Sequence, residues 1–301
     1  MPWLNLKGFF TPVLAKPAVS DIVWGMTLRV RNTILYCIAA AVFGVAVSLI
    51  ALAPRIVSLF QVLSLSERVL LFSRSFGEWR VYQTQLSVVL LSMVAPLLVS
   101  VLGYLGFLRF FRKITGPLIF FFFIFLGSLV FETLPIWTLL ARMNREPLGL
   151  IAGLTRLHTF GLILGGAALF TAGLYTAGVK YQYQGGALII TLGVAGGLSY
   201  LLPVDVSVMA SNFLAKAGLS SIVSLVLVFL MAATLLNFFK SSLMNQSPGD
   251  MVYGFSVVGM MAGRWMIHSS PNVWMLVVGV VLLITGSVVY ARRVFRAYLW
   301  Y

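Results

Sequence analysis

The chain has 301 residues, of which 60% are hydrophobic and only 9% are charged, and its formal net charge is +14. Soluble domains carry about 25% charged residues, so the composition excludes a water-soluble globular protein. The positive charge does not call for nucleic acid, because basic residues that flank membrane spans fix their orientation and meet anionic headgroups.

Apolar runs of about 20 residues recur along the whole chain, and this is the length of helix that crosses a bilayer core. The runs do not show the alternation of a membrane β-barrel. We therefore predict an all-α polytopic membrane protein with one transmembrane domain over residues 33–291. A cytoplasmic or interfacial segment, 1–32, precedes it, and a basic, aromatic cytoplasmic tail, 292–301, follows it.

The N-terminal segment mixes Trp and Phe residues with Lys7 and Lys16, a composition that suits a segment lying on the membrane surface; a partly ordered tail is the alternative. Eight spans are expected to follow. They cover residues 33–53, 84–108, 117–141, 157–178, 185–203, 217–239, 251–268 and 272–291.

Residues 55–74 are apolar but carry Glu67 and Arg68, with polar residues at helical spacing. We predict an amphipathic helix at the outer surface between the first two spans; a ninth span is the alternative. The basic clusters 109–113 and 292–296 favour the eight-span arrangement, with both termini in the cytoplasm, because basic residues concentrate on the cytoplasmic side.

Small residues four apart let two helices approach closely in a membrane. Such pairs predict helix-packing positions at Gly161, Gly165, Gly193, Gly197, Gly259 and Gly263. Ordinary packing is the simplest interpretation, and a sliding or oligomer interface is the alternative. The bulky run Phe120–Phe123 predicts a surface that faces lipid or another subunit.

Glu132 is the one charge in "PLIFFFFIFLGSLVFETLPIW", residues 117–137. A carboxylate in lipid is costly and should face the bundle with a partner; Arg156 is the first candidate for that partner and Lys216 the second. Pro135 removes a backbone donor and could leave a carbonyl open nearby. An ion pair that only stabilises the bundle is one interpretation of Glu132.

The alternative is a polar vestibule that binds a substrate, an ion or a proton in the outer half of the membrane. On the predicted spans, six residues collect there. They are Glu132, Arg156, His158, Lys216, Arg264 and His268. A metal site would require both histidines and a carboxylate to converge, which spacing alone does not predict, so we expect neither a metal nor another cofactor.

The sequence contains no Walker lysine loop, no HExxH, no paired cysteines and no DxxxD motif, which argues against an enzyme. We expect an inner-membrane transport subunit, a permease or channel for a small solute, lipid or ion. A non-catalytic subunit of a larger secretion or envelope complex is the alternative, and an intramembrane enzyme acting on lipid-linked substrates is the third. The expected partners are the lipid bilayer and other membrane or peripheral subunits, with no nucleic acid.

Overall fold

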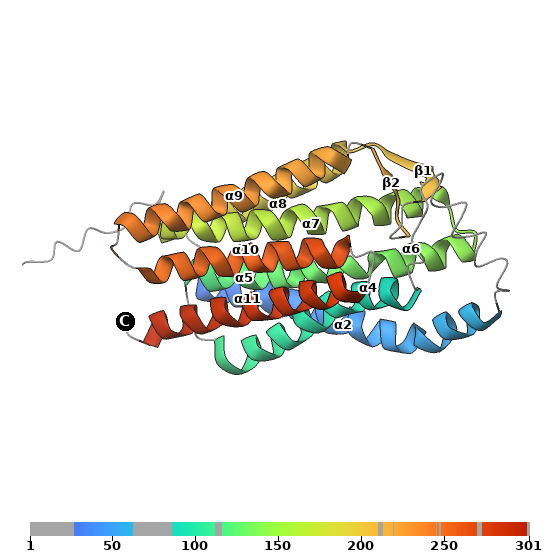
Figure 1. Ribbon diagram of the computed structural model, residues 1–301, viewed down its shortest axis with the longest axis horizontal. Coiled ribbons are helices and arrows are strands. Elements are labelled where there is room, and N and C mark those ends of the chain that lie inside the picture. The colour runs from blue at the N-terminus through green and yellow to red at the C-terminus, as the bar shows by residue number, and fades with distance from the viewer. Residues whose placement is uncertain are drawn as a thin grey trace, which may run out of the picture.

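The computed structural model describes residues 27–62, 86–111, 116–209, 213–218, 220–244, 246, 248–269 and 273–299. Long helices that lie side by side make up the molecule (Figure 1). In chain order the elements are α2 (Leu28–Val62), α4 (Leu86–Gly106), the π-helix η1 (Phe107–Phe111), α5 (Pro117–Ser128), the 3₁₀-helix η2 (Leu129–Thr133), α6 (Leu134–Met143), α7 (Leu148–Thr176), the 3₁₀-helix η3 (Tyr181–Tyr183), α8 (Gln184–Leu201), β1 (Val204–Met209), β2 (Ala215–Ala217), α9 (Ser220–Met244), α10 (Pro248–His268) and α11 (Val273–Leu299).

Within the described residues, a helical rod coincides with each of the eight predicted spans, and α5, η2 and α6 together form the third rod. Seven of these eight described rods are long and apolar enough to cross a membrane. The remaining rod, α10, carries Asp250, Arg264 and His268. These findings support the prediction of a multi-pass helical membrane protein, while the number of spans and their orientation stay predictions.

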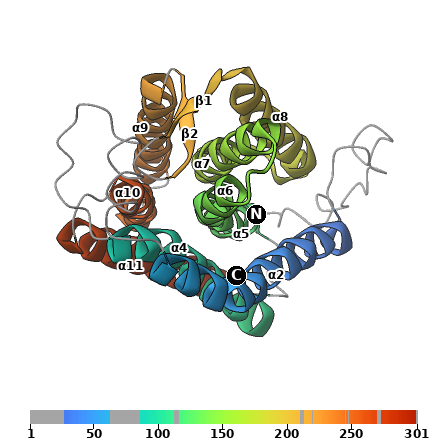
Figure 2. The same cartoon turned by 90° about the vertical axis from the view of Figure 1, so that its right-hand side faces the viewer.

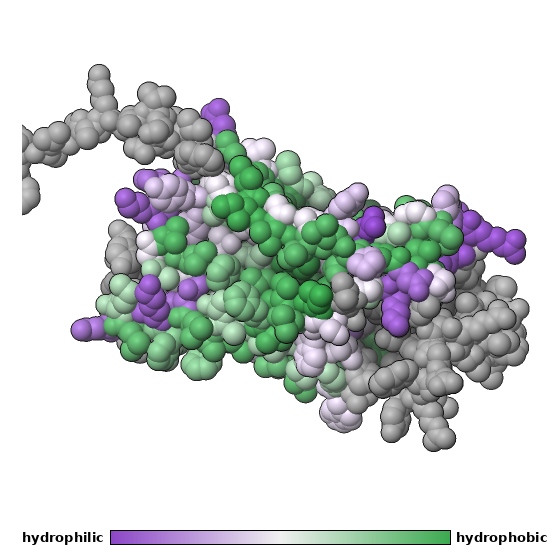
Figure 3. Space-filling view, turned by 90° about the horizontal axis from the view of Figure 1, so that it is seen from above, coloured by the Kyte–Doolittle hydropathy of each residue, from purple (hydrophilic) through white to green (hydrophobic). Residues whose placement is uncertain are grey.

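The third rod and α7 form the centre of the bundle. In the most apolar stretch of each rod, 83% of the residues are buried in the third rod and 72% in α7, against 17% in α2 and in α9. Figure 2 shows α5, α6 and α7 between two outer groups, with α2, α4 and α11 on one side and α8 and α9 on the other. Apolar side chains cover the middle of the face in Figure 3, and hydrophilic ones gather toward its two ends, as expected where the middle faces lipid.

The aromatic run on α5 corrects one prediction. Phe120, Phe121, Phe122 and Phe123 are all buried within the bundle rather than turned toward lipid. They lie on the central rod, where neighbouring helices cover every face, and a run of apolar letters cannot distinguish a central helix from a peripheral one.

These phenylalanines belong to a set of ring contacts that crosses the bundle, which we call the aromatic layer. Phe121 stacks on Tyr175 of α7 with ring centroids 5.9 Å apart, and Phe122 stacks on Tyr290 of α11 at 5.0 Å. Tyr253 of α10 connects Tyr290 to Phe238 of α9. Five helices therefore contribute rings to one layer in the half of the bundle that lies away from the β-strands.

The antiparallel strands β1 and β2 lie between the predicted spans 185–203 and 217–239 and were not predicted. Asp205 pairs in register with Lys216, and the hydroxyl and backbone N–H of Ser207 donate to the Asp205 carboxylate, which lowers its pKa. The strands lie beside the ends of α6 and α7 (Figure 1). The guanidinium of Arg142 donates to the carbonyl of Val206 at 2.9 Å and anchors β1 to the bundle.

Two further boundaries differ from the prediction. α7 begins at Leu148, directly after Pro147, rather than at residue 157, so Arg156 and His158 lie inside a helix instead of at its start. α11 runs to Leu299 rather than ending near residue 291, so Arg292, Arg293 and Arg296 lie on its last turns. Of the predicted segment 1–32, residues 1–26 lie outside the described residues. Of the predicted surface helix 55–74, residues 55–62 continue α2 without a break and the rest lie outside the described residues.

Candidate functional site

Glu132 lies where the central rod changes from an α-helix to a tighter 3₁₀ turn. The turn, η2, spans Leu129–Thr133, and α6 begins directly after it with Pro135 in its first turn. Proline has no N–H, so it offers no α-helical donor to the carbonyl of Phe131 four residues earlier. That carbonyl accepts the N–H of Leu134 instead and keeps a lone pair for another partner.

Arg264 of α10 is the partner of Glu132. Its Nε donates to Oε1 of Glu132 at 2.7 Å, and both side chains are buried. Its other nitrogens donate to Ser128, Nη1 to the hydroxyl at 3.0 Å and Nη2 to the carbonyl at 3.3 Å. The central rod thus binds the guanidinium through one charge and two neutral acceptors, which compensates a pair of buried charges better than a single contact would.

Gly165 of α7 provides the space for this arrangement. A Cβ at residue 165 would overlap the Arg264 guanidinium and the Ser128 hydroxyl. The absence of a side chain there allows Arg264 to reach across from α10 to the central rod.

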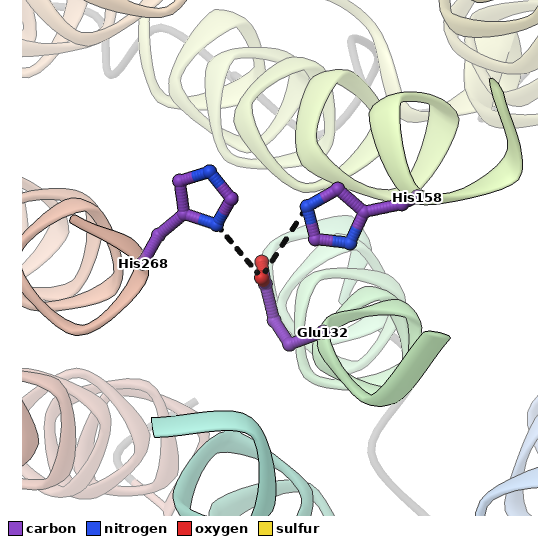
Figure 4. A group of neighbouring side chains, drawn as sticks. All are labelled: Glu132, His158 and His268. Atoms are coloured by element: carbon purple, nitrogen blue, oxygen red, sulfur yellow. Dashed lines mark ion pairs between the residues drawn. The ribbon is translucent and has the colours of Figure 1, made fainter. Parts of the chain in front are cut away.

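Two histidines approach the second carboxylate oxygen from opposite sides (Figure 4). Nε2 of His158, on α7, lies 3.7 Å from Oε2 of Glu132, and Nδ1 of His268, at the end of α10, lies 3.4 Å from the same atom. The two imidazole rings stack with centroids 5.2 Å apart and planes inclined by 22°. Glu132 therefore presents one oxygen to Arg264 and the other to both histidines. We call these four residues the polar cluster.

A cavity of about 620 Å³ lies beside the polar cluster. His158, Arg264 and His268 form its polar end, together with the hydroxyls of Thr155 and Thr159 on α7. Its other walls are mostly apolar and come from α7, α9, α10 and the strand β2. The cavity thus combines a long apolar wall with a charged and imidazole-bearing end.

The structure brings four of the six predicted vestibule residues together, namely Glu132, His158, Arg264 and His268. The other two lie elsewhere, so the expected partners of Glu132 were wrong. Arg156 places its guanidinium over the Tyr200 ring at 5.3 Å, and Lys216 is exposed on β2. The error has a geometric cause: Arg156 is two residues before His158, and residues two apart point to different faces of a helix.

The six predicted packing glycines fall into three groups. Gly161 lies against the Phe131 ring, and Gly165 against Arg264. A Cβ on Gly263 would come within 2.6 Å of the α11 backbone at the Gly279 oxygen, whereas a Cβ on Gly259 would lie 3.7 Å from its nearest neighbour. Gly193 and Gly197 on α8 have no described atom within 4 Å of such a Cβ.

The sequence interpretation missed Ser128, Thr155 and Thr159, whereas the open carbonyl that Pro135 indicated is that of Phe131, which contacts His158. A hydroxyl one helical turn before a buried acid is the only sequence signal that would have indicated Ser128. Thr155, His158 and Thr159 follow the i, i+3, i+4 spacing of one helical stripe. Thr155 and Thr159 each donate to the carbonyl four residues earlier, at 3.0 and 3.1 Å. The Thr155 oxygen also accepts the N–H of Ala215 at 3.2 Å, so it keeps one acceptor position for a ligand, and the Thr159 oxygen can accept as well.

The polar cluster offers three kinds of chemistry. It contains a charge-balanced pair, two imidazoles that can exchange protons, and a candidate metal-ligating set formed by Glu132, His158 and His268. One ligand atom from each of these three residues lies within 4.8 Å of the others. The convergence that spacing could not predict is therefore present.

No protein-family model, no curated protein and no solved structure matches this chain. Function must therefore be inferred from the polar cluster and its cavity.

Proposed function

We propose that this chain is a membrane transport protein that moves a small amphiphilic solute or lipid through the cavity between α7, α9 and α10. The observation that carries the proposal is the position of the polar cluster. Glu132, His158 and Arg264 are buried among apolar helices, yet His158, Arg264 and His268 form one end of a cavity of about 620 Å³. A polar cluster that only stabilised the bundle would need no cavity beside it.

The lining indicates the chemistry of the occupant. Leu227, Met231 and Met261 are among the apolar side chains of the walls, while two imidazoles, two hydroxyls and a guanidinium converge at one end. Pockets for small molecules are mostly apolar, with few polar groups that fix orientation. A molecule with an apolar body and one polar group satisfies both parts of this lining, and its polar group would lie against His158 and His268.

A second function is favoured by the same residues. Two imidazoles that face a cavity, with a carboxylate in contact with both, are groups that general acid–base catalysis uses. An intramembrane enzyme that cleaves a lipid-linked substrate would employ the same site. The two proposals differ in outcome, because a transporter releases its substrate unchanged on the other side of the membrane.

Native mass spectrometry of the protein, extracted from its own host in a mild detergent, tests the proposal. We expect the wild-type protein to retain a small molecule. Leu227→Trp fills the cavity wall and should abolish retention. Leu225→Trp is the matched control, since Leu225 is on the same helix, 70% exposed and outside the cavity, and it should retain the molecule.

The retained molecule is then supplied to proteoliposomes. Movement across the membrane without chemical change, lost in Leu227→Trp but not in Leu225→Trp, supports transport. Conversion to a product supports the enzyme instead. If Leu227→Trp retains the molecule as the wild type does, the cavity is not the binding site and the proposal fails.

A further inference from the structure

The imidazole of His158 has a fixed tautomer. Its Nδ1 lies 2.9 Å from the carbonyl oxygen of Phe131. A carbonyl can only accept a hydrogen bond, so Nδ1 carries the proton and donates it. In a neutral imidazole the other nitrogen, Nε2, is then an acceptor with a free lone pair.

That lone pair has no hydrogen-bond partner among the described residues. Nε2 of His158 is buried and points at Oε2 of Glu132, 3.7 Å away. A carboxylate oxygen is also an acceptor, so two acceptors face each other in a buried site. A buried acceptor without a partner costs free energy, and a cation between the two atoms would satisfy Nε2, while Oε2 already has the His268 ring at 3.4 Å.

The spacing of the candidate ligands fits a metal ion. Nitrogen and oxygen ligands of zinc lie about 2.0–2.1 Å from the ion, and tetrahedral angles then place them about 3.3 Å apart. Oε2 of Glu132 lies 3.4 Å from Nδ1 of His268 and 3.7 Å from Nε2 of His158. The two histidine nitrogens lie within 4.8 Å of each other, so a relative movement of the rings by up to about 1.5 Å completes the tetrahedral spacing.

The outer contacts of these ligands are those that metal sites use. Metal-bound imidazoles donate their other N–H to a carbonyl or carboxylate, and metal-bound carboxylates accept hydrogen bonds in turn. His158 donates Nδ1–H to Phe131, and the Oε1 atom of Glu132 accepts from Arg264. Both contacts orient the remaining ligand atom toward the same point.

We propose that Glu132, His158 and His268 bind a divalent first-row transition-metal ion, of the zinc or cobalt class, through Oε2, Nε2 and Nδ1. Two imidazoles and one carboxylate suit this class, whereas Mg²⁺ and Ca²⁺ take oxygen ligands. Three protein ligands leave a fourth position open, as in two-histidine, one-glutamate zinc sites. Because both imidazoles line the cavity, that position faces the cavity and accepts an anionic or lone-pair group of its occupant.

The charge of the site is consistent with such an occupant. Glu132 and Arg264 balance each other, so a divalent ion adds positive charge that water cannot screen in this apolar setting. An anionic group at the open position would reduce this charge. The inference uses the same site as the proposed function but does not require transport, since the ion is held whether or not the cavity passes a substrate.

The test is metal binding by the full-length protein in detergent, purified through an affinity tag without histidine. The background is Cys37→Ser, because Cys37 is an exposed free thiol that binds metals. After removal of metals with a chelator, Zn²⁺ is titrated by calorimetry, and Co²⁺ by its visible d–d absorption. We expect one ion per chain and the intense visible bands of four-coordinate Co²⁺.

The variants are His158→Gln and His268→Gln, with Asp205→Asn as the matched control. Removing contacts beside a metal ligand lowers affinity about 10–100-fold, so losing a ligand should lower it by at least about 100-fold and remove the Co²⁺ bands. Asp205 is an exposed acid on β1 outside the site, and Asp205→Asn should bind as the parent does. Circular dichroism and size-exclusion profiles show that each variant is folded.

Two results would overturn the inference. One is the absence of stoichiometric Zn²⁺ and Co²⁺ binding by the folded parent protein. The other is equal affinity in the parent, His158→Gln and His268→Gln. Neither result bears on the proposed function, because retention of an organic molecule and its loss in Leu227→Trp are measured independently of the metal.

Discussion

The pair formed by Glu132 and Arg264 makes a quantitative prediction for the free energy of unfolding. Glu132→Gln leaves the guanidinium buried without its counter-charge, and Arg264→Gln leaves the carboxylate in the same situation. Removing one partner of a buried pair costs about 3–5 kcal/mol. The double variant Glu132→Gln/Arg264→Gln contains no charge in the pair, and its two amides can hydrogen-bond to each other and to Ser128.

The magnitude of the coupling follows from this difference. Independent effects would add to a loss of about 6–10 kcal/mol in the double variant. Because neither uncompensated charge remains in it, we expect a loss smaller than that of either single variant and a coupling energy of at least about 3 kcal/mol. Glu132→Gln should cost more than Arg264→Gln, since a carboxylate can take up a proton in a dry site and arginine does not lose one.

Reversible unfolding in mixed micelles, followed by circular dichroism, measures all four corners of the cycle. Arg156→Gln in the same assay is the matched control, because Arg156 has no contact with Glu132 and loses only its cation–π contact with Tyr200. Additive losses in the double variant would refute the reasoning and would mean that the two charges do not depend on each other.

Three further predictions concern other parts of the bundle. Gly263→Val should destabilise the protein by about 1–3 kcal/mol or more, because its Cβ would come within 2.6 Å of the α11 backbone. Gly193→Val is the control and should change the midpoint of thermal unfolding little. Equal midpoints for the two variants would mean that the contact between α10 and α11 does not require a glycine. Arg156→Ala should keep whatever activity the protein shows and lose about 0.5–1 kcal/mol of stability at most. If Arg156→Ala instead lost as much activity as Glu132→Gln, Arg156 would have to be counted among the functional residues. In a Cys37→Ser background, Asn144→Cys should react with an impermeant thiol reagent in intact cells and Lys180→Cys should react only after lysis, and the reverse pattern would invert the predicted orientation.

The sequence predicts the helical rods of this protein well, for a physical reason. A span must satisfy its backbone hydrogen bonds internally and present apolar side chains over a fixed length. The local sequence of each rod is therefore enough to predict that rod. The same logic places Glu132 inside the bundle, because a lone carboxylate is too costly in lipid.

What the sequence does not predict is which helices meet. Arg264 is 132 residues from Glu132, and no local pattern connects them. The burial of Phe120–Phe123 and the contact of Arg156 with Tyr200 were not predicted for the same reason, because both depend on residues of other helices. The strands β1 and β2 were missed because residues 204–217 are too short and too mixed to stand out between two long apolar runs.

The aromatic layer has a consequence for the cell that carries this protein. A cavity that reached through the whole bundle would be a conduit for ions and would discharge the membrane potential. The rings of Phe121, Phe122, Tyr175, Tyr253 and Tyr290 pack against one another between the polar cluster and the far end of the bundle. None of these rings lines the cavity beside the polar cluster, so, on the proposed function, a cargo that crossed the whole bundle would have to separate these stacked rings.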